Sequence, residues 1–158
     1  MSSFYLDTSA IVKRYAREPG SGVVSHLYRQ ATTGRSRLCF SEWNVGETLG
    51  ALQKKARKAR RPQGFQRAKG RLHGEISSLT NLGVLAIASV GGHLLHETWT
   101  LLERRFLYAA DALQIATAKD QRCDYFVTAD QDLYDAAKAE GLTPLHIVEE
   151  QSAVRKLA

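Results

Sequence analysis

Short apolar runs alternate with longer segments of helical periodicity along the whole chain, and this alternation restricts the fold more than any other feature. The runs occupy residues 4–6, 38–40, 84–87, 125–127 and 145–148. Runs that are apolar throughout are typical of strands buried on both faces, and parallel neighbours need crossover connections. We therefore predict an α/β fold of three layers, in which helices flank a short, mainly parallel sheet.

The segments between the apolar runs carry helix signals. Ser41 can cap a long helix that Pro62 interrupts, so this helix and the next are expected to form a protruding helical hairpin. Residues 109–118 are apolar almost all round, which predicts a buried helix, and a polar tail is expected after the last strand. A chain of 158 residues without linker or internal repeat predicts one domain, residues 1–158.

The positive charge of the chain is concentrated in the predicted hairpin. The formal net charge is +6, and nine of the 22 basic residues lie between positions 54 and 71, where no acid occurs. The rest of the chain is therefore slightly acidic. Such a local basic patch attracts polyanions by steering and counterion release, whereas the alternative interpretation is a solvated helix face that binds nothing.

Acidic residues follow the predicted strands at one edge of the sheet. Asp7 ends the first strand and Asp130 comes just after the fourth, and ligands collect at the carboxyl ends of parallel strands. Asp111 lies in the apolar helix, where an unpaired carboxylate would cost several kcal/mol, so either an arginine or a metal ion shared with Asp7 should compensate it. Glu47, in the first turns after the second strand, is expected near the same edge.

Four short motifs occur in order along the chain. They are Phe4-Tyr5-Leu6-Asp7-Thr8-Ser9-Ala10, Ser41 with Glu47, Tyr108-Ala109-Ala110-Asp111-Ala112-Leu113 with Ala116-Thr117-Ala118, and Phe126-Val127-Thr128-Ala129-Asp130. Together they make the chain similar to ribonucleases of the PIN-domain family, and most similar to VapC-type toxins of toxin–antitoxin pairs. The resemblance covers nearly the whole chain. Gly46, a poor helix former before Glu47, and Asp132, close to Asp130, depart from the family pattern.

The resemblance implies a metal-dependent endoribonuclease whose catalytic carboxylates are Asp7, Glu47, Asp111 and Asp130. Carboxylates without histidine or cysteine favour hard cations, so Mg²⁺ is expected, with Mn²⁺ as a substitute. Asp7, Asp111 and Asp130 are the expected ligands, with Glu47 and Asp132 as further candidates. The ion would polarise the scissile phosphate and lower the pKa of a bound water.

Two further groups of residues are expected to support this chemistry. Thr8, Ser9 and Thr128 carry hydroxyls that can orient a carboxylate, although helix capping or a turn is an equal alternative for them. The hairpin is expected to hold RNA phosphates as positioning contacts rather than to read sequence. The RNA-binding candidates are Lys54, Lys55, Arg57, Lys58, Arg60 and Arg61.

The resemblance also implies an antitoxin protein that covers the acidic cleft, and a homodimer. No leader or long apolar stretch occurs, and the two cysteines are far apart without a paired motif, so a reduced, cytoplasmic protein away from membranes is expected. Two alternatives stay open. One is a nucleic-acid-binding module without catalysis, and the other is a nuclease that processes RNA as a housekeeping enzyme.

Overall fold

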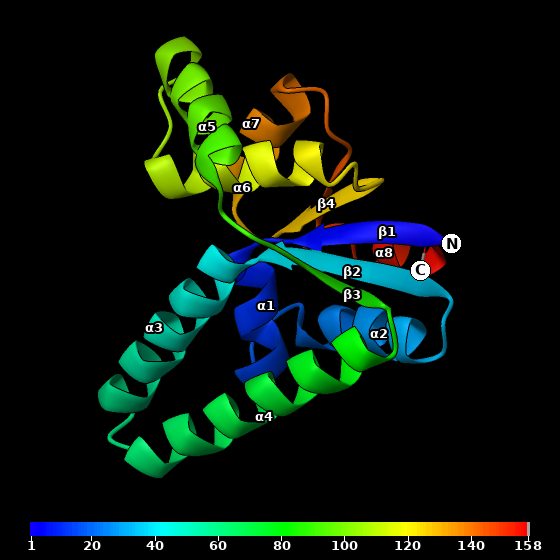
Figure 1. Ribbon diagram of the computed structural model, residues 1–158. Helices are drawn as coiled ribbons and strands as arrows, with labels where there is room; N and C mark the ends of the chain where they lie inside the picture. The colour runs from blue at the N-terminus through cyan, green and yellow to red at the C-terminus, as the bar shows by residue number, and fades with distance from the viewer. Residues whose placement is uncertain (158) are drawn as a thin grey trace.

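The computed structural model of the chain describes residues 1–157, and Figure 1 shows a sheet seen nearly edge-on between two groups of helices. The elements in chain order are β1 (Ser2–Leu6), α1 (Thr8–Tyr15), α2 (Ser21–Thr32), β2 (Ser36–Ser41), α3 (Glu42–Lys58), α4 (Pro62–Asn81), β3 (Leu85–Ala88), α5 (Gly92–Arg104), α6 (Ala109–Asp120), β4 (Tyr125–Thr128), α7 (Gln131–Ala139), β5 (Pro144–His146) and α8 (Gln151–Leu157).

All five strands run parallel in one sheet, in the order β3-β2-β1-β4-β5. The first strand of the chain is therefore the central strand, with β2 on one side and β4 on the other. The strand order reverses direction at β1, and crevices at such a switch point are where open α/β sheets bind ligands. The predicted fold class is confirmed, and the sheet is parallel throughout rather than mainly so.

Each face of the sheet is covered by its own helices. Helices α1, α2 and α4 lie on one side in Figure 1, and α5, α6 and α7 lie on the other. Successive residues of β1 point to opposite faces, so Phe4 and Leu6 enter one apolar core while Tyr5 enters the second. Both faces of β1 are fully buried, which explains why its sequence is apolar without alternation.

The predicted helical hairpin is confirmed as α3 and α4, which meet at a turn away from the sheet, at the lower left of Figure 1. Ser41 caps α3 through a capping box with Asn44, and Pro62 stands in the first turn of α4. The connection includes Arg60 with φ 54°, a left-handed conformation that residues other than glycine rarely adopt. No helix among residues 1–157 is both long and apolar enough to cross a bilayer.

The C-terminal segment differs from expectation. The last strand is β5, Pro144–His146, shorter at its end than predicted, and the expected polar tail is wrong because α8 forms there. Val154 of α8 is fully buried in the first core, and α8 packs against α2. Val154 is the one buried residue among the seven of α8, so the helix depends on this packing rather than on its own sequence.

Candidate active site

Asp7 is held rigidly at the end of β1, where its side chain also caps α1. It is only 2% exposed, and its carboxylate accepts hydrogen bonds from the Ala10 N–H at 2.7 Å, the Ser9 hydroxyl at 2.8 Å and the Thr128 hydroxyl at 2.7 Å. Burial and, to a smaller extent, the charge of Asp130 raise the pKa of Asp7 to about 6, against the opposing effect of these donors. The expected supporting hydroxyls of Ser9 and Thr128 are thus in contact with Asp7.

Glu47 is held by the third expected hydroxyl. Its Oε2 accepts a hydrogen bond from Thr8 Oγ1 at 2.6 Å, which links the second turn of α3 to the start of α1. Because Thr8 follows Asp7 directly, the acid on α3 is fixed relative to the acid at the end of β1. Gly46 leaves α3 unbroken, so the departure from the expected pattern does not misplace Glu47.

A buried polar network lies beneath these two acids. The Asn44 amide donates to Thr8 Oγ1 at 3.0 Å and to Gln114 Oε1 at 2.8 Å, and the Thr8 N–H also donates to Gln114 Oε1 at 3.1 Å. On its other side Asn44 accepts from the Tyr5 hydroxyl at 2.8 Å. The network ties β1, α1, α3 and α6 together at the point where the acids emerge, and buried networks of this kind fix geometry when every member is paired.

Asp111 and Asp130 line the same pocket as Asp7 and Glu47. Asp111, in the first turn of α6, is half-buried, and within residues 1–157 it has neither an ion pair nor a hydrogen bond. The arginine partner that would have compensated it is therefore absent from the described chain. Burial raises its pKa, and the charges of Asp130, Glu47 and Asp132 raise it further. Asp130 caps α7 by accepting from the Leu133 N–H at 3.1 Å.

The four predicted acids line one open pocket of about 430 Å³. Thr8 and Ser9 line it as well, whereas Asp132 does not belong to its lining. At the rim, Glu18 forms ion pairs with Lys13 at 3.1 Å and with Lys55. We refer to this pocket as the acidic cleft.

The donors of the acidic cleft suit a hard cation. They are carboxylate and hydroxyl oxygens, with no histidine or cysteine in the lining, and this set matches Mg²⁺ or Mn²⁺ rather than Zn²⁺. Each acid raises the cost of ionising its neighbours, which a divalent ion would offset. Among residues 1–157 no three acids, histidines or cysteines are close enough to form a ready coordination shell. The metal ligands thus stay a prediction.

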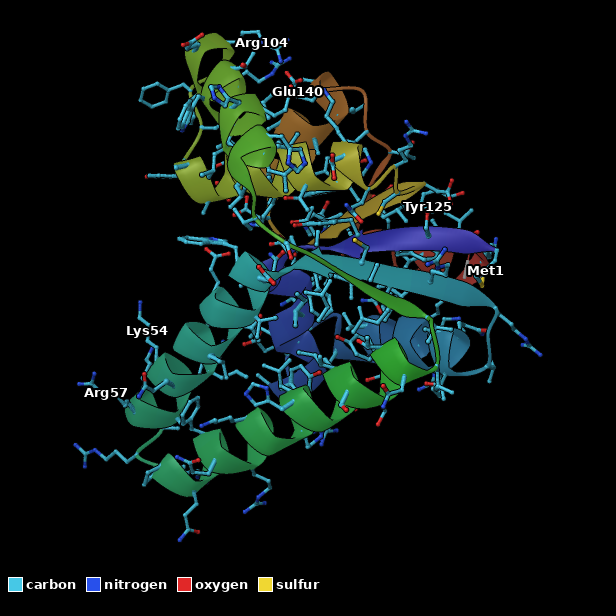
Figure 2. All side chains as sticks on the ribbon, viewed as in Figure 1. Met1, Lys54, Arg57, Arg104, Tyr125 and Glu140 are labelled. Carbon is cyan, nitrogen blue, oxygen red and sulfur yellow. The ribbon has the colours of Figure 1, made fainter. Side chains whose placement is uncertain are left out.

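The predicted RNA-binding residues separate into three groups. Lys54, Arg57 and Lys58 are exposed on α3, and Figure 2 shows Lys54 and Arg57 pointing away from the body of the molecule. Arg60 and Arg61 instead line a second pocket at the hairpin connection. Lys55 alone reaches the acidic cleft.

Asn44 and Gln114 are the site residues that sequence reasoning missed. A glutamine inside the otherwise apolar α6, one turn after Asp111, was the available signal, because a buried amide requires partners. Lys13 and Glu18 at the rim were also missed, and nothing in their local sequence distinguishes them from solvated charges.

Comparisons with known proteins agree with this fold. The family model described as "PIN domain" matches residues 4–139. A search among curated proteins finds no match. The fold is similar to VapC20 of Mycobacterium tuberculosis, a sarcin-ricin loop cleaving toxin, with TM-score 0.64, 17% identity and coverage of 90% of this chain and 98% of that one.

Two further solved structures show the same fold. VapBC2 of Rickettsia felis, bound to a promoter DNA fragment, has TM-score 0.58 and 17% identity, with 91% of this chain and 98% of that one covered. FitAcB of Neisseria gonorrhoeae has TM-score 0.57 and 19% identity, with coverage of 92% and 99%.

Proposed function

Because this chain belongs to the PIN-domain family, we propose that it is a metal-dependent endoribonuclease and the toxin of a type II toxin–antitoxin pair. The observation that supports this most is the convergence of four carboxylates from β1, α3, α6 and α7 on one cleft. A structural role would leave each acid paired within the protein, yet Asp111 has no such partner among the described residues. Its unpaired charge is what a metal-binding nuclease site requires.

Different residues of the chain would have different roles in the hydrolysis. Asp7, Asp111 and Asp130 would hold Mg²⁺, with Glu47 completing the site. A bound Mg²⁺ supplies Lewis acidity to the scissile phosphate and lowers the pKa of a coordinated water. Glu47, fixed through Oε2 by Thr8, would accept the proton of the attacking water. In-line attack would form the new P–O bond and break the bond to the 3′ oxygen, which takes a proton from solvent, so that a 5′-phosphate and a 3′-hydroxyl are left.

The decisive experiment replaces Asp7 and Asp111, two of the acids that line the cleft. Asp7→Asn and Asp111→Asn should each lower Mg²⁺-dependent RNA cleavage by at least about a hundredfold, because each removes a charge that holds the metal. Asp135→Asn, an exposed acid of α7 outside the cleft lining, is the matched control and should stay active.

Chelation completes this test. Wild-type cleavage should stop in EDTA and return when Mg²⁺ is added, whereas a module that only binds RNA would keep binding without metal. Full activity in both cleft variants, or cleavage that survives EDTA, would contradict the proposed function. Circular dichroism of the variants separates loss of chemistry from loss of fold.

An antitoxin is the partner that best fits the acidic cleft. Two of the solved structures with this fold carry names of paired complexes, VapBC2 and FitAcB. The cleft gathers five acids against two lysines, so an extended basic segment of a partner would be electrostatically favoured there. Growth arrest on expression, relieved by co-expressing the protein encoded beside it, would support this pairing, and unrelieved arrest would count against it.

A homodimer is the second assembly we propose. Exposed apolar side chains gather on α5 and on the connection to α6, where Trp99 is 53% exposed and Phe106 and Tyr108 are more exposed still. Clusters of exposed aromatic residues mark interaction surfaces in soluble proteins. Sedimentation equilibrium should show a dimer that Trp99→Ser weakens, and a wild-type monomer at all concentrations would exclude it.

A further inference from the structure

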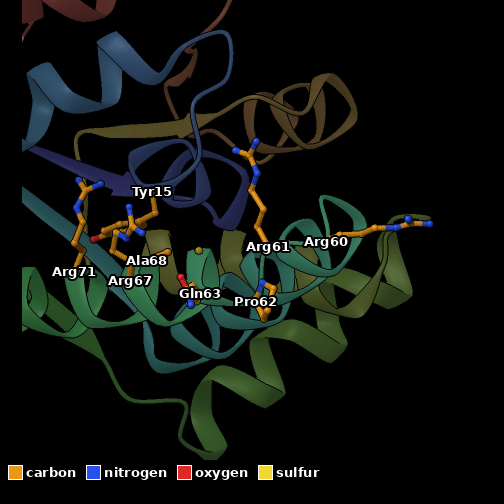
Figure 3. A pocket seen from close by; sticks show the side chains of 9 residues that line it. Tyr15, Arg60, Arg61, Pro62, Gln63, Arg67, Ala68 and Arg71 are labelled. Atoms are coloured by element: carbon orange, nitrogen blue, oxygen red, sulfur yellow. The ribbon is translucent and has the colours of Figure 1, made fainter.

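A second pocket lies between α1 and the start of α4, and its charge is opposite to that of the acidic cleft. Four arginines line it, together with Tyr15 at the end of α1, and no acid belongs to its lining. Its volume is about 570 Å³. In Figure 3, Arg67 and Arg71 lie beside Tyr15, while Arg60 points away from the others. We call this the arginine pocket, with Arg60, Arg61, Arg67 and Arg71 as its basic residues.

The positive charge of the arginine pocket is largely uncompensated. Arg61 and Arg67 make no ion pair within residues 1–157, and Arg71 approaches Glu75 only to 3.9 Å. Glu75 is already engaged by Arg14 through two hydrogen bonds, at 2.5 and 3.0 Å. The first turn of α4 has no side-chain cap, so the positive end of its dipole adds to the charge there.

The acidic cleft cannot supply the affinity for an RNA strand by itself. Its carboxylates repel phosphates, and the two lysines at its rim are already paired with Glu18. Binding of nucleic acid depends mainly on cations that displace counterions from phosphates. A strand whose scissile bond enters the cleft therefore needs cationic contacts nearby, outside the cleft.

The arginine pocket is next to the cleft along two elements. On α1, Val12 and Lys13 line the cleft while Tyr15 lines the arginine pocket, a separation of less than one helical turn, about 5 Å along the axis. On the hairpin, Lys55 of α3 reaches the cleft, and Arg61 follows six residues later in the connection to α4. One extended strand can thus contact both pockets.

We propose that the arginine pocket binds a backbone phosphate of the RNA strand that the cleft cleaves, a few nucleotides from the scissile bond. This inference rests on the proposed ribonuclease function. Guanidinium groups suit the task because their planar donors match two phosphate oxygens and stay charged at every physiological pH. The contact positions the strand and does not read its sequence. An acidic protein segment is the other ligand that four arginines could take.

The test measures binding apart from cleavage. Arg61→Gln with Arg67→Gln, placed on an Asp111→Asn background to prevent hydrolysis, is titrated with a labelled single-stranded RNA of about 15 random nucleotides. Affinity should fall on the order of tenfold, and the slope of log affinity against log salt should flatten by about 0.7 for each lost contact. Arg35→Gln, an exposed arginine between α2 and β2, is the matched control and should change neither value.

Cleavage by the same arginine variants in the active protein should show a raised KM with little change in kcat, because the reacting groups are untouched. Unchanged RNA affinity and salt slope would overturn the proposal, even if the protein is an active nuclease. If RNA affinity is unchanged while affinity for poly-glutamate falls, the pocket takes an acidic protein instead and the proposal is wrong. Failure of the ribonuclease function would appear separately, as cleavage that persists in the Asp7 and Asp111 variants.

Discussion

Gln114 occupies a position in α6 that an apolar residue would fill in an ordinary buried helix. Its Oε1 is the shared acceptor for the Asn44 amide and the Thr8 backbone N–H, and Thr8 in turn holds Glu47. A polar side chain that satisfies two buried donors is costly to replace, because each donor left without an acceptor carries its own desolvation penalty. Gln114 is therefore a positioning residue for the acid on α3.

Gln114→Leu should reduce kcat about tenfold or more while KM for RNA stays near the wild-type value, because the Leu side chain cannot hold Thr8 and Asn44 in place. The free energy of unfolding should fall by about 1 to 3 kcal/mol. Steady-state cleavage and urea unfolding measure the two effects. Gln121→Leu, at the exposed end of α6, is the control. An unchanged kcat in Gln114→Leu would show that the network is structural only.

The raised pKa of Asp7 makes the metal-free protein less stable as the pH rises. The carboxyl titrates near 3.8 when unfolded and about 6 when folded, so between these values the folded chain holds the proton more tightly. Protonated Asp7 makes its full contribution to the free energy of unfolding below pH 3.8, and this contribution is lost as the pH rises through 6. The full difference is about 3 kcal/mol.

Urea unfolding in EDTA at pH 4 and pH 7 checks this expectation. The drop in unfolding free energy between the two pH values should be smaller in Asp7→Asn than in the wild type, because the variant has no carboxyl to ionise at that site. An identical drop in both proteins would mean that the buried carboxylate is fully compensated by its hydroxyl and amide donors.

The acids of the cleft could be predicted from the sequence more fully than the neutral residues that position them. Asp7 and Asp111 were predicted from local features, a strand end and an apolar helix, and both lie in the cleft. Asn44 could not be recognised in this way, because its role depends on the close approach of β1, α1 and α6, which belongs to tertiary structure. The sequence shows which residues carry charge, and the packing of elements decides which neutral residues hold them.

At the scale of elements, α3 carries Glu47 despite a glycine beside it. Gly46 has helical geometry, and a Cβ added there would meet no atom within 4 Å. Glycine in a helix costs about 1 kcal/mol relative to alanine because its backbone is freer when unfolded. Gly46 therefore lowers the stability of α3, and no neighbouring atom requires a glycine at this position.

Gly46→Ala should raise the free energy of unfolding by about 1 kcal/mol, equivalent to about 2 to 4 °C in Tm for a chain of this size. RNA cleavage should be unaffected, because the Thr8 contact of Glu47 is preserved. Thermal unfolding followed by circular dichroism measures the change. Gly83→Ala is the contrasting control: its φ of +70° strains an alanine, so that variant should be destabilised. Destabilisation by Gly46→Ala would imply a role for local flexibility in α3.

Elements with strong local signals were predicted, and those that depend on distant partners were not. The α3–α4 hairpin has a capping serine at one end and a proline at its turn, so its position was clear from the sequence. Helix α8 has seven residues and a single fully buried side chain, Val154, so its stability comes from contact with α2. A seven-residue polar segment without that partner would have no reason to be helical.

At the scale of the whole molecule, the two pockets give the protein an uneven charge that its net value of +6 conceals. The acidic cleft extends along α1 as far as Lys13 and the arginine pocket begins at Tyr15, so a negative and a positive region lie next to each other. Alternating strands and helices predicted the parallel sheet and its layers, but not the strand order. The strand order depends on long-range pairing between strands, and no local pattern in β1 indicates that this strand lies at the centre of the sheet.

The central place of β1 has a consequence for the time at which the protein can become active during synthesis. β1 leaves the ribosome first, yet its neighbour β4 and the hydroxyl of Thr128 that holds Asp7 follow about 120 residues later. Pairings so distant in the chain form slowly and only once both partners are present. A nascent chain shorter than residue 128 therefore lacks an assembled cleft, and a damaging nuclease would stay harmless to the ribosome that is making it until most of its length is complete.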